Sequence, residues 1–168
     1  VYGGIDWGSG NGGDFTVVVL LDSEGVVARI EAFSNLGAVE QVERIAELLG
    51  SYPTLKAVNV EINSIGSVFY DNLRAKMSNP ACLRKFNTTN DTKRDIIEEL
   101  ISAFQTQKIS IPQDEELIRE LQHYSVEKTA KGYTYNGSDG VHDDYCMALA
   151  FAWWARKKNN GDFRLVFV

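Results

Sequence analysis

The 168-residue chain is 44% hydrophobic and 24% charged, and its 17 Lys and Arg against 23 Asp and Glu give a formal net charge of −6. Such a composition excludes a disordered or fibrous protein, and the length favours one domain over residues 1–168. The acidic balance argues against a passive nucleic-acid coat, but it allows an enzyme whose carboxylates hold metal ions.

No secretory or membrane signal is visible in the sequence. Residues 1–6 lack a basic segment followed by an apolar one, and the longest apolar run, 145–155, is shorter than the roughly 18 residues that cross a bilayer. Cys82 and Cys146 lie in segments typical of a core, which favours a reducing compartment. Without a CxxC motif and with two histidines, a structural zinc site is not expected, so any metal would be bound by oxygen.

Hydrophobic periodicity predicts a mixed α/β chain. Three strands are expected first, at 3–7, 15–21 and 26–33, with a glycine-rich loop at 8–13 and a turn at 22–25. Helices and strands then alternate. The expected segments are a helix around 39–49, a strand at 57–62, a helix at 67–77, a strand at 82–86, a helix carrying 96–104, a shorter helix around 117–121, a hairpin at 124–135 and a last helix at 143–158.

Carboxylates interrupt apolar segments at three places. Asp6 lies in the first strand, Glu61 interrupts the apolar residues Val58, Val60 and Ile62 of a strand expected to be central, and Asp143 and Asp144 open the nearly all-apolar last helix. An isolated carboxylate is costly in such surroundings, whereas carboxylates that converge can be compensated by a hard divalent cation such as Mg²⁺ or Mn²⁺. These four residues are therefore predicted metal ligands.

Each acidic residue also has a purely structural explanation. Asp6 could cap the turn that follows it, Glu61 could pair with a buried Arg or Lys, and one of Asp143 and Asp144 could be a helix N-cap. The glycine-rich loop could cradle phosphate, although the absence of GxxxxGK[ST] excludes a P-loop. The three positions together favour a site more strongly than any one of them.

Helix geometry distinguishes Asp143 from Asp144, because neighbouring residues in a helix point about 100° apart. Small side chains in line with Asp144 would let that face of the helix approach the sheet closely: Ala148, Ala152 and Ala155. Asp143 is in line with bulkier residues. We therefore predict that Asp144 is the essential ligand and that Asp143 is a cap, an outer acid or a weaker ligand.

Several other residues are candidates for supporting roles. Asp14 ends the glycine-rich loop and places another carboxylate near the first hairpin. His142 precedes Asp143 and is a predicted accessory group, with a solvated loop histidine as the alternative. Cations on segments expected to flank the site are candidate DNA contacts, or else ordinary surface charges. They are Arg84, Lys85, Lys93, Arg94, Lys128 and Lys131.

Four segments together resemble the nuclease domain of phage terminase large subunits. They are Gly4-Ile5-Asp6-Trp7-Gly8, Asp14-Phe15-Thr16-Val17, Val60-Glu61-Ile62-Asn63-Ser64-Ile65-Gly66, and His142-Asp143-Asp144 leading into 148–152. The resemblance covers nearly the whole chain. It implies an RNase H-like fold, in which a central mixed β-sheet contains an antiparallel three-strand meander and is flanked by helices.

The same resemblance implies an activity and partners. The activity is a metal-dependent endonuclease that cuts double-stranded viral DNA concatemers during packaging, with two Mg²⁺ or Mn²⁺ ions. The resemblance makes Asp6, Glu61 and one of Asp143 and Asp144 the catalytic metal ligands, and Asp14 an accessory acid; the helix geometry selects Asp144 from the pair. The implied partners are a packaging ATPase domain, which these residues do not include, a portal and a small terminase subunit, in the host cytoplasm and without a membrane.

Two other functions remain as alternatives. An actin-like or sugar-kinase ATPase fragment also opens with a Gly-Ile-Asp-x-Gly strand, although such proteins need two lobes, which 168 residues do not hold. The other alternative is a catalytically inactive RNase H-like docking module.

Overall fold

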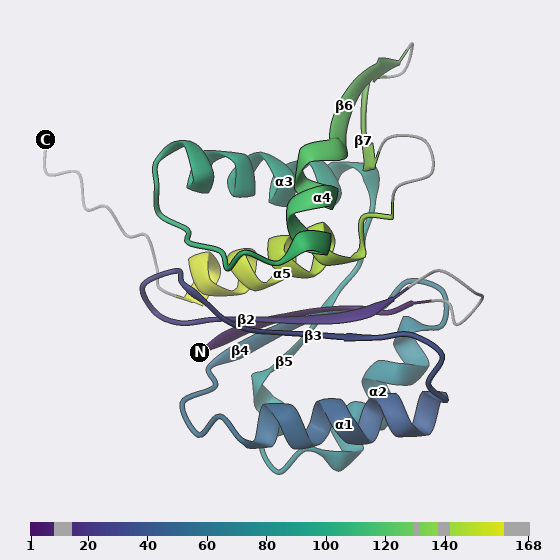
Figure 1. The fold of residues 1–168 in the computed structure, drawn as a ribbon. Coiled ribbons are helices and arrows are strands. Elements are labelled where there is room, and N and C mark those ends of the chain that lie inside the picture. Colours follow the sequence, from purple (N-terminus) through teal and green to yellow (C-terminus); the bar gives the residue numbers. More distant parts are fainter. Residues whose placement is uncertain (9–14, 130–131, 138–141, 160–168) are drawn as a thin grey trace, which may run out of the picture.

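The computed structural model describes residues 1–8, 15–129, 132–137 and 142–159 (Figure 1), and for 126–129 and 132–137 it describes the backbone alone. The elements follow the predicted order. They are β1 (Tyr2–Asp6), β2 (Thr16–Leu21), β3 (Val27–Phe33), α1 (Ala38–Gly50), β4 (Ala57–Glu61), α2 (Gly66–Lys76), the 3₁₀ turn η1 (Pro80–Cys82), β5 (Leu83–Phe86), α3 (Asn90–Gln105), α4 (Glu115–His123), β6 (Tyr124–Thr129), β7 (Gly132–Gly137) and α5 (Asp144–Asn159).

Five strands form a mixed sheet in the order β3-β2-β1-β4-β5. The first three strands are an antiparallel meander, whereas β4 lies parallel to β1 and β5 lies parallel to β4. β1 therefore has a hydrogen-bonded neighbour on each side and occupies the middle of the sheet. The remaining strands, β6 and β7, pair as a separate antiparallel hairpin.

Helices cover both faces of this sheet. α5 lies directly on one face, with α3 and α4 beyond it, whereas α1 and α2 cover the other face (Figure 1). The β-branched run of β2 serves both layers because successive side chains of a strand point to opposite faces. Val17 and Val19 join the α5 core, and Val18 joins the core beneath α1. Within the described residues, no helix has the length and apolar character needed to span a bilayer.

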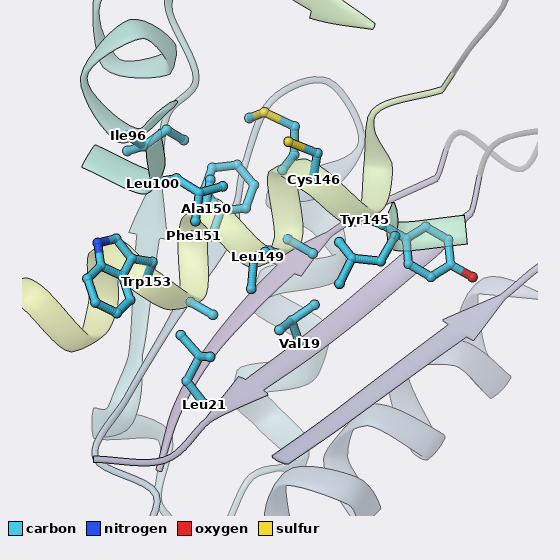
Figure 2. Packing of buried hydrophobic residues seen from close by; sticks show 14 of the residues in the cluster. Val19, Leu21, Ile96, Leu100, Tyr145, Cys146, Leu149, Ala150, Phe151 and Trp153 are labelled. Carbon is cyan, nitrogen blue, oxygen red and sulfur yellow. The ribbon is translucent and has the colours of Figure 1, made fainter. Parts of the chain in front are cut away.

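α5 is almost entirely buried, which explains its continuous apolar sequence. Figure 2 shows Leu149 of α5 above Val19 and Leu21 of β2, and all three belong to one buried cluster. A buried side chain of β4 ties the same helix to the sheet, because Asn59 Nδ2 donates a hydrogen bond of 3.0 Å to the carbonyl oxygen of Phe151. That bond satisfies a polar group that would otherwise be costly to bury.

The closest approach of α5 to the sheet is at Gly4 in β1. A methyl group added at Gly4 would overlap the main-chain oxygen of Ala148 and the main-chain nitrogen of Ala152. The helix backbone thus rests on the strand backbone, and only small residues fit on either side. The predicted stripe of small residues in α5 indeed faces the sheet.

Replacing Gly4 by Ala should therefore lower the free energy of unfolding by about 3 kcal/mol or more, because the added methyl group meets backbone and not a movable side chain. Gly50→Ala is the matched control: nothing lies near its added methyl group, and alanine favours the last turn of α1 by up to about 1 kcal/mol. Urea unfolding measures both variants. Equal stability of the two variants would contradict the proposed contact.

Candidate active site

Two of the predicted acids, Asp6 and Glu61, lie side by side at the ends of β1 and β4, beneath α5. Gly4 and Asn59 are aligned in the parallel β1–β4 register, and both face α5. Since alternate residues of a strand face the same side, Asp6 and Glu61, two positions further on, face α5 as well. Asp6 is buried, Glu61 is half-buried, and the two carboxyl groups share a hydrogen bond.

Asp144 reaches the same place from the first residue of α5. Ala148 lies against the backbone at Gly4. Asp144 is four residues, about one helical turn, before Ala148, and Asp6 is two residues after Gly4 on the same face of β1. Asp144 Oδ2 accepts a hydrogen bond of 2.8 Å from the backbone N–H of Phe15, so this carboxylate ties the start of α5 to the residue directly before β2. Ala148 and Ala152 face the sheet as expected, whereas the role of Asp144 as the essential ligand stays a prediction.

Asp143 is held differently from its neighbour. Its carbonyl oxygen accepts the N–H of Met147 at 2.8 Å, so Asp143 occupies the position before the first turn of α5. Its Oδ2 lies 2.8 Å from Nζ of Lys93 on α3, in an ion pair that is mostly buried on both sides. Lys93 thereby brings a positive charge to the acidic cluster.

The electrostatics of the cluster are dominated by Asp6. Burial raises the pKa of Asp6 well above its ordinary range, and the charge and hydrogen bond of Glu61 and the charges of Asp144 and Asp143 raise it further. Carboxylate oxygens that repel one another in a buried place are the donors that a hard divalent cation prefers. The donor chemistry therefore fits Mg²⁺ or Mn²⁺. As they stand, the described residues contain no group of three His, Cys, Asp or Glu side chains arranged to hold an ion.

Glu120 is a carboxylate that the sequence analysis did not connect with the site. It lies on α4, is 2% exposed, and its Oε2 accepts the N–H of Cys146 at 2.9 Å. Burial raises its pKa to about 7, helped by the charges of Asp144 and Asp143, while N–H groups of Cys146 and Tyr145 oppose the shift. The available signal was its spacing, three residues after the buried Leu117 on the apolar face of α4.

A second set of residues that the sequence analysis missed, Thr16 and Gln41, holds the chain where it leaves β1. The N–H of Gly8 donates to Thr16 Oγ1 at 3.0 Å, and the Thr16 hydroxyl donates to Gln41 Oε1 at 2.7 Å. Gln41 Nε2 in turn donates to the carbonyl oxygen of Leu36 at 2.8 Å. Thr16 and Gln41 are both buried, so this chain of bonds holds the segment directly after Asp6.

The cations predicted as DNA contacts are dispersed. Of the six, Lys93 lies at the acidic cluster, and the next residue, Arg94, pairs with exposed acids of its own helix. Arg84 and Lys85 lie on opposite faces of β5. Arg84 Nη2 donates to Asn159 Oδ1 at 2.7 Å, near the far end of α5, whereas Lys85 lies 3.6 Å from Asp71 on α2.

The remaining predicted site residues are less completely described. Lys128 belongs to β6, of which the backbone is described, and His142 is exposed directly before Asp143. Asp14 and Lys131 lie outside the described residues.

The strand order, the meander and the flanking helices define an RNase H-like fold, with the acids at the ends of β1, β4 and the start of the last helix. The family model of the terminase RNaseH-like domain matches residues 3–155, and the chain belongs to this family.

Known proteins with similar sequence or structure carry the same family name. The terminase large subunit of Thermus phage G20c is 26% identical over 152 residues, which are 89% of this chain and 30% of that protein. The chain therefore spans under a third of that relative. Crystal structures of the large terminase nuclease from thermophilic phage G20c, with bound magnesium and with bound cobalt, both superpose with a TM-score of 0.80. Each is 23% identical and covers 92% of this chain and 80% of its own.

The raised pKa of Asp6 predicts a pH dependence of the metal-free protein. Between the ordinary pKa of an aspartate and the raised one, the folded state binds more protons than the unfolded state, so stability falls as the pH rises. Asp6→Asn removes this pH-dependent contribution to the free energy of unfolding. In EDTA, the variant should melt about 2–4 °C above the native protein at pH 8, for a gain of about 1 kcal/mol, and should gain less at pH 5.

Asp22→Asn is the control for this measurement. Asp22 Oδ1 accepts the N–H groups of Glu24 and Val26, both at 2.9 Å, in the turn between β2 and β3. Removing that carboxylate should lower the melting temperature at pH 8. A native protein that is as stable at pH 8 as at pH 5, and an Asp6→Asn variant no more stable, would contradict the repulsion at Asp6.

Proposed function

We propose that this chain is the nuclease part of a terminase large subunit, an endonuclease that hydrolyses phosphodiester bonds of double-stranded DNA and cuts viral concatemers during packaging. The observation that supports the proposal is that Asp6 is buried at the end of β1, beneath α5, where the charges of Glu61 and Asp144 act on it. The family assignment and the nucleases of similar structure support it.

The proposed cofactor is a pair of Mg²⁺ or Mn²⁺ ions held by Asp6, Glu61, Asp144 and, more weakly, Asp143. The magnesium and cobalt bound to the G20c nuclease support a site for divalent ions. When bound, such ions supply the Lewis acidity for hydrolysis, by lowering the pKa of the attacking water and by neutralising charge at the phosphate and the leaving 3′ oxygen.

The protein's own groups prepare the site by holding its acids in place. The Phe15 N–H fixes the Asp144 carboxylate, and Lys93 fixes that of Asp143. Lys93 also provides a partly buried positive charge where a DNA phosphate would approach the acids. We infer that Lys128, on the hairpin, is a second contact, and that Arg84 contributes less because it lies toward the far end of α5.

The same proposal extends to the partners of this chain in a whole large subunit. In a whole large subunit, this nuclease would act with a packaging ATPase domain, a portal and a small subunit in the host cytoplasm. The ATPase-fragment alternative has no support from the family assignment. An inactive docking module remains the alternative to be tested, because family membership does not require retained activity.

Conversion of supercoiled plasmid to nicked and linear DNA tests the proposed roles of the acids. Asp6→Asn, Glu61→Gln and Asp144→Asn should each lower cleavage at least 100-fold, since each removes ligand charge with little change in volume. Asp143→Asn should retain measurable cleavage and need more metal. Native activity in Asp6→Asn or Glu61→Gln would remove that residue from the site, and an active Asp144→Asn beside an inactive Asp143→Asn would reverse their roles.

Metal dependence tests the cofactor separately from the acids. Mn²⁺ should raise the melting temperature of the native protein, because a ligand that binds only the folded state stabilises it. The gain should vanish in Asp6→Asn. EDTA should stop cleavage without unfolding the protein, and added Mn²⁺ should restore it. Cleavage that survives exhaustive chelation would refute the metal mechanism, and ATP hydrolysis without DNA cleavage would favour the ATPase alternative.

A further inference from the structure

The start of α5 carries two of the proposed metal ligands and needs hydrogen-bond acceptors. The first N–H groups of any helix have no partner within the helix, and at a buried helix start each needs one. Tyr145 and Cys146, the second and third residues of α5, are both buried. Their N–H groups therefore require acceptors supplied from elsewhere in the protein.

The usual acceptor is the side chain of the residue before the helix, which here is Asp143. The backbone of Asp143 is arranged as at an ordinary helix N-cap, because its carbonyl oxygen accepts the N–H of Met147. Its carboxylate instead accepts from Lys93 Nζ at 2.8 Å. Asp144 is likewise engaged elsewhere, with its Oδ2 on the N–H of Phe15.

Glu120 takes over the capping of α5 from a different helix. Its Oε2 accepts the Cys146 N–H at 2.9 Å, and the N–H of Tyr145 lies near enough to the same carboxylate to lower its pKa. Its own helix, α4, begins 29 residues before α5 and packs against it. Because the Glu120 carboxylate faces backbone N–H groups in a place that is 2% exposed, Glu120 is suited to hold the helix start and not to bind an ion itself.

We infer that Glu120 is a positioning residue for the metal ligands of α5: by capping the start of this helix at the N–H of Cys146, it leaves the carboxylates of Asp143 and Asp144 to serve the site. The inference rests on the proposed function, since it assigns Glu120 a task toward the same ions. Residues that orient the ligands of a metal typically change its affinity by about 10- to 100-fold when they are replaced.

The test combines calorimetric titration of Mn²⁺ with plasmid cleavage at increasing Mn²⁺. In Glu120→Gln, which keeps the size of the side chain, we expect the Kd for Mn²⁺ and the half-saturating Mn²⁺ to rise together by about 10-fold or more. Cleavage should recover at saturating Mn²⁺, because the ligands remain present. Amide hydrogen exchange at Cys146 should become faster, because an amide oxygen is a weaker acceptor than a carboxylate, and this reports the weakened cap independently of activity.

Two further variants make the result specific. Glu120→Asp keeps a carboxylate one methylene shorter, so its Kd should lie between those of the native protein and Glu120→Gln, and it replaces Glu120→Gln if that variant does not fold. Asp22→Asn also loses a carboxylate that accepts two backbone N–H groups, at 2.9 Å each, but in the turn between β2 and β3. It should lower the melting temperature and leave the Kd for Mn²⁺ unchanged.

The outcomes separate this inference from the proposed function. A folded Glu120 variant with the native Kd and native half-saturating Mn²⁺ would overturn the positioning role alone. So would an Asp22→Asn variant that weakens Mn²⁺ binding as much as Glu120→Gln, because the effect would then follow general stability. A native protein that neither binds Mn²⁺ nor cuts DNA would overturn the proposed function, and the role of Glu120 with it.

Discussion

The contact between Gly4 and the backbone of α5 sets the geometry of everything around it. Glycine on the strand and alanines on the helix allow two backbones to approach more closely than ordinary side chains permit. Once that contact is fixed, the helix start must lie over the carboxyl-terminal ends of β1 and β4. Asn59 of the neighbouring strand β4 also fixes the position of α5, because its side-chain amide donates a hydrogen bond to the main-chain carbonyl oxygen of Phe151.

A cluster of acids at that place is costly, and the structure spreads the compensation over several elements. Asp6 is disposed to keep a proton, Lys93 of α3 neutralises Asp143, and the N–H of Phe15 faces Asp144. Glu120 adds another negative charge but directs it at the positive end of α5, where a helix favours an anion. The site is thus held by interactions between elements that are far apart in the sequence.

Much of this architecture could be predicted from the sequence, because the core strands and helices have clear periodicity. Asp6 and Glu61 could be proposed as site residues because they break apolar patterns in which charge is rare, and their role stays a prediction. Their convergence followed from the ends of strands meeting at one edge, and the phase of α5 followed from small residues four apart. The resemblance to terminase nucleases supplied the fold name, which the family match confirms.

The contacts that tie the site together could not be predicted in the same way. Glu120 fits an amphipathic helix equally well as a surface or a buried residue, and its target amides lie on another helix. Lys93 was expected to contact DNA, and its pairing with Asp143 depends on how α3 is placed against α5. Element ends also differ by a residue or two: β4 ends at Glu61 and not at 62, and α5 begins at Asp144, because side-chain patterns do not mark where the last backbone hydrogen bond forms.

The packing of β1 on α5 also determines when this contact can form during synthesis of the protein. During translation β1 leaves the ribosome more than a hundred residues before α5, and its middle has no partner helix until Ala148 and Ala152 have been made. Asp6 and Glu61 are then present without Asp144. A nascent chain therefore carries Asp6 and Glu61 without the acid of α5 until synthesis has passed the start of that helix.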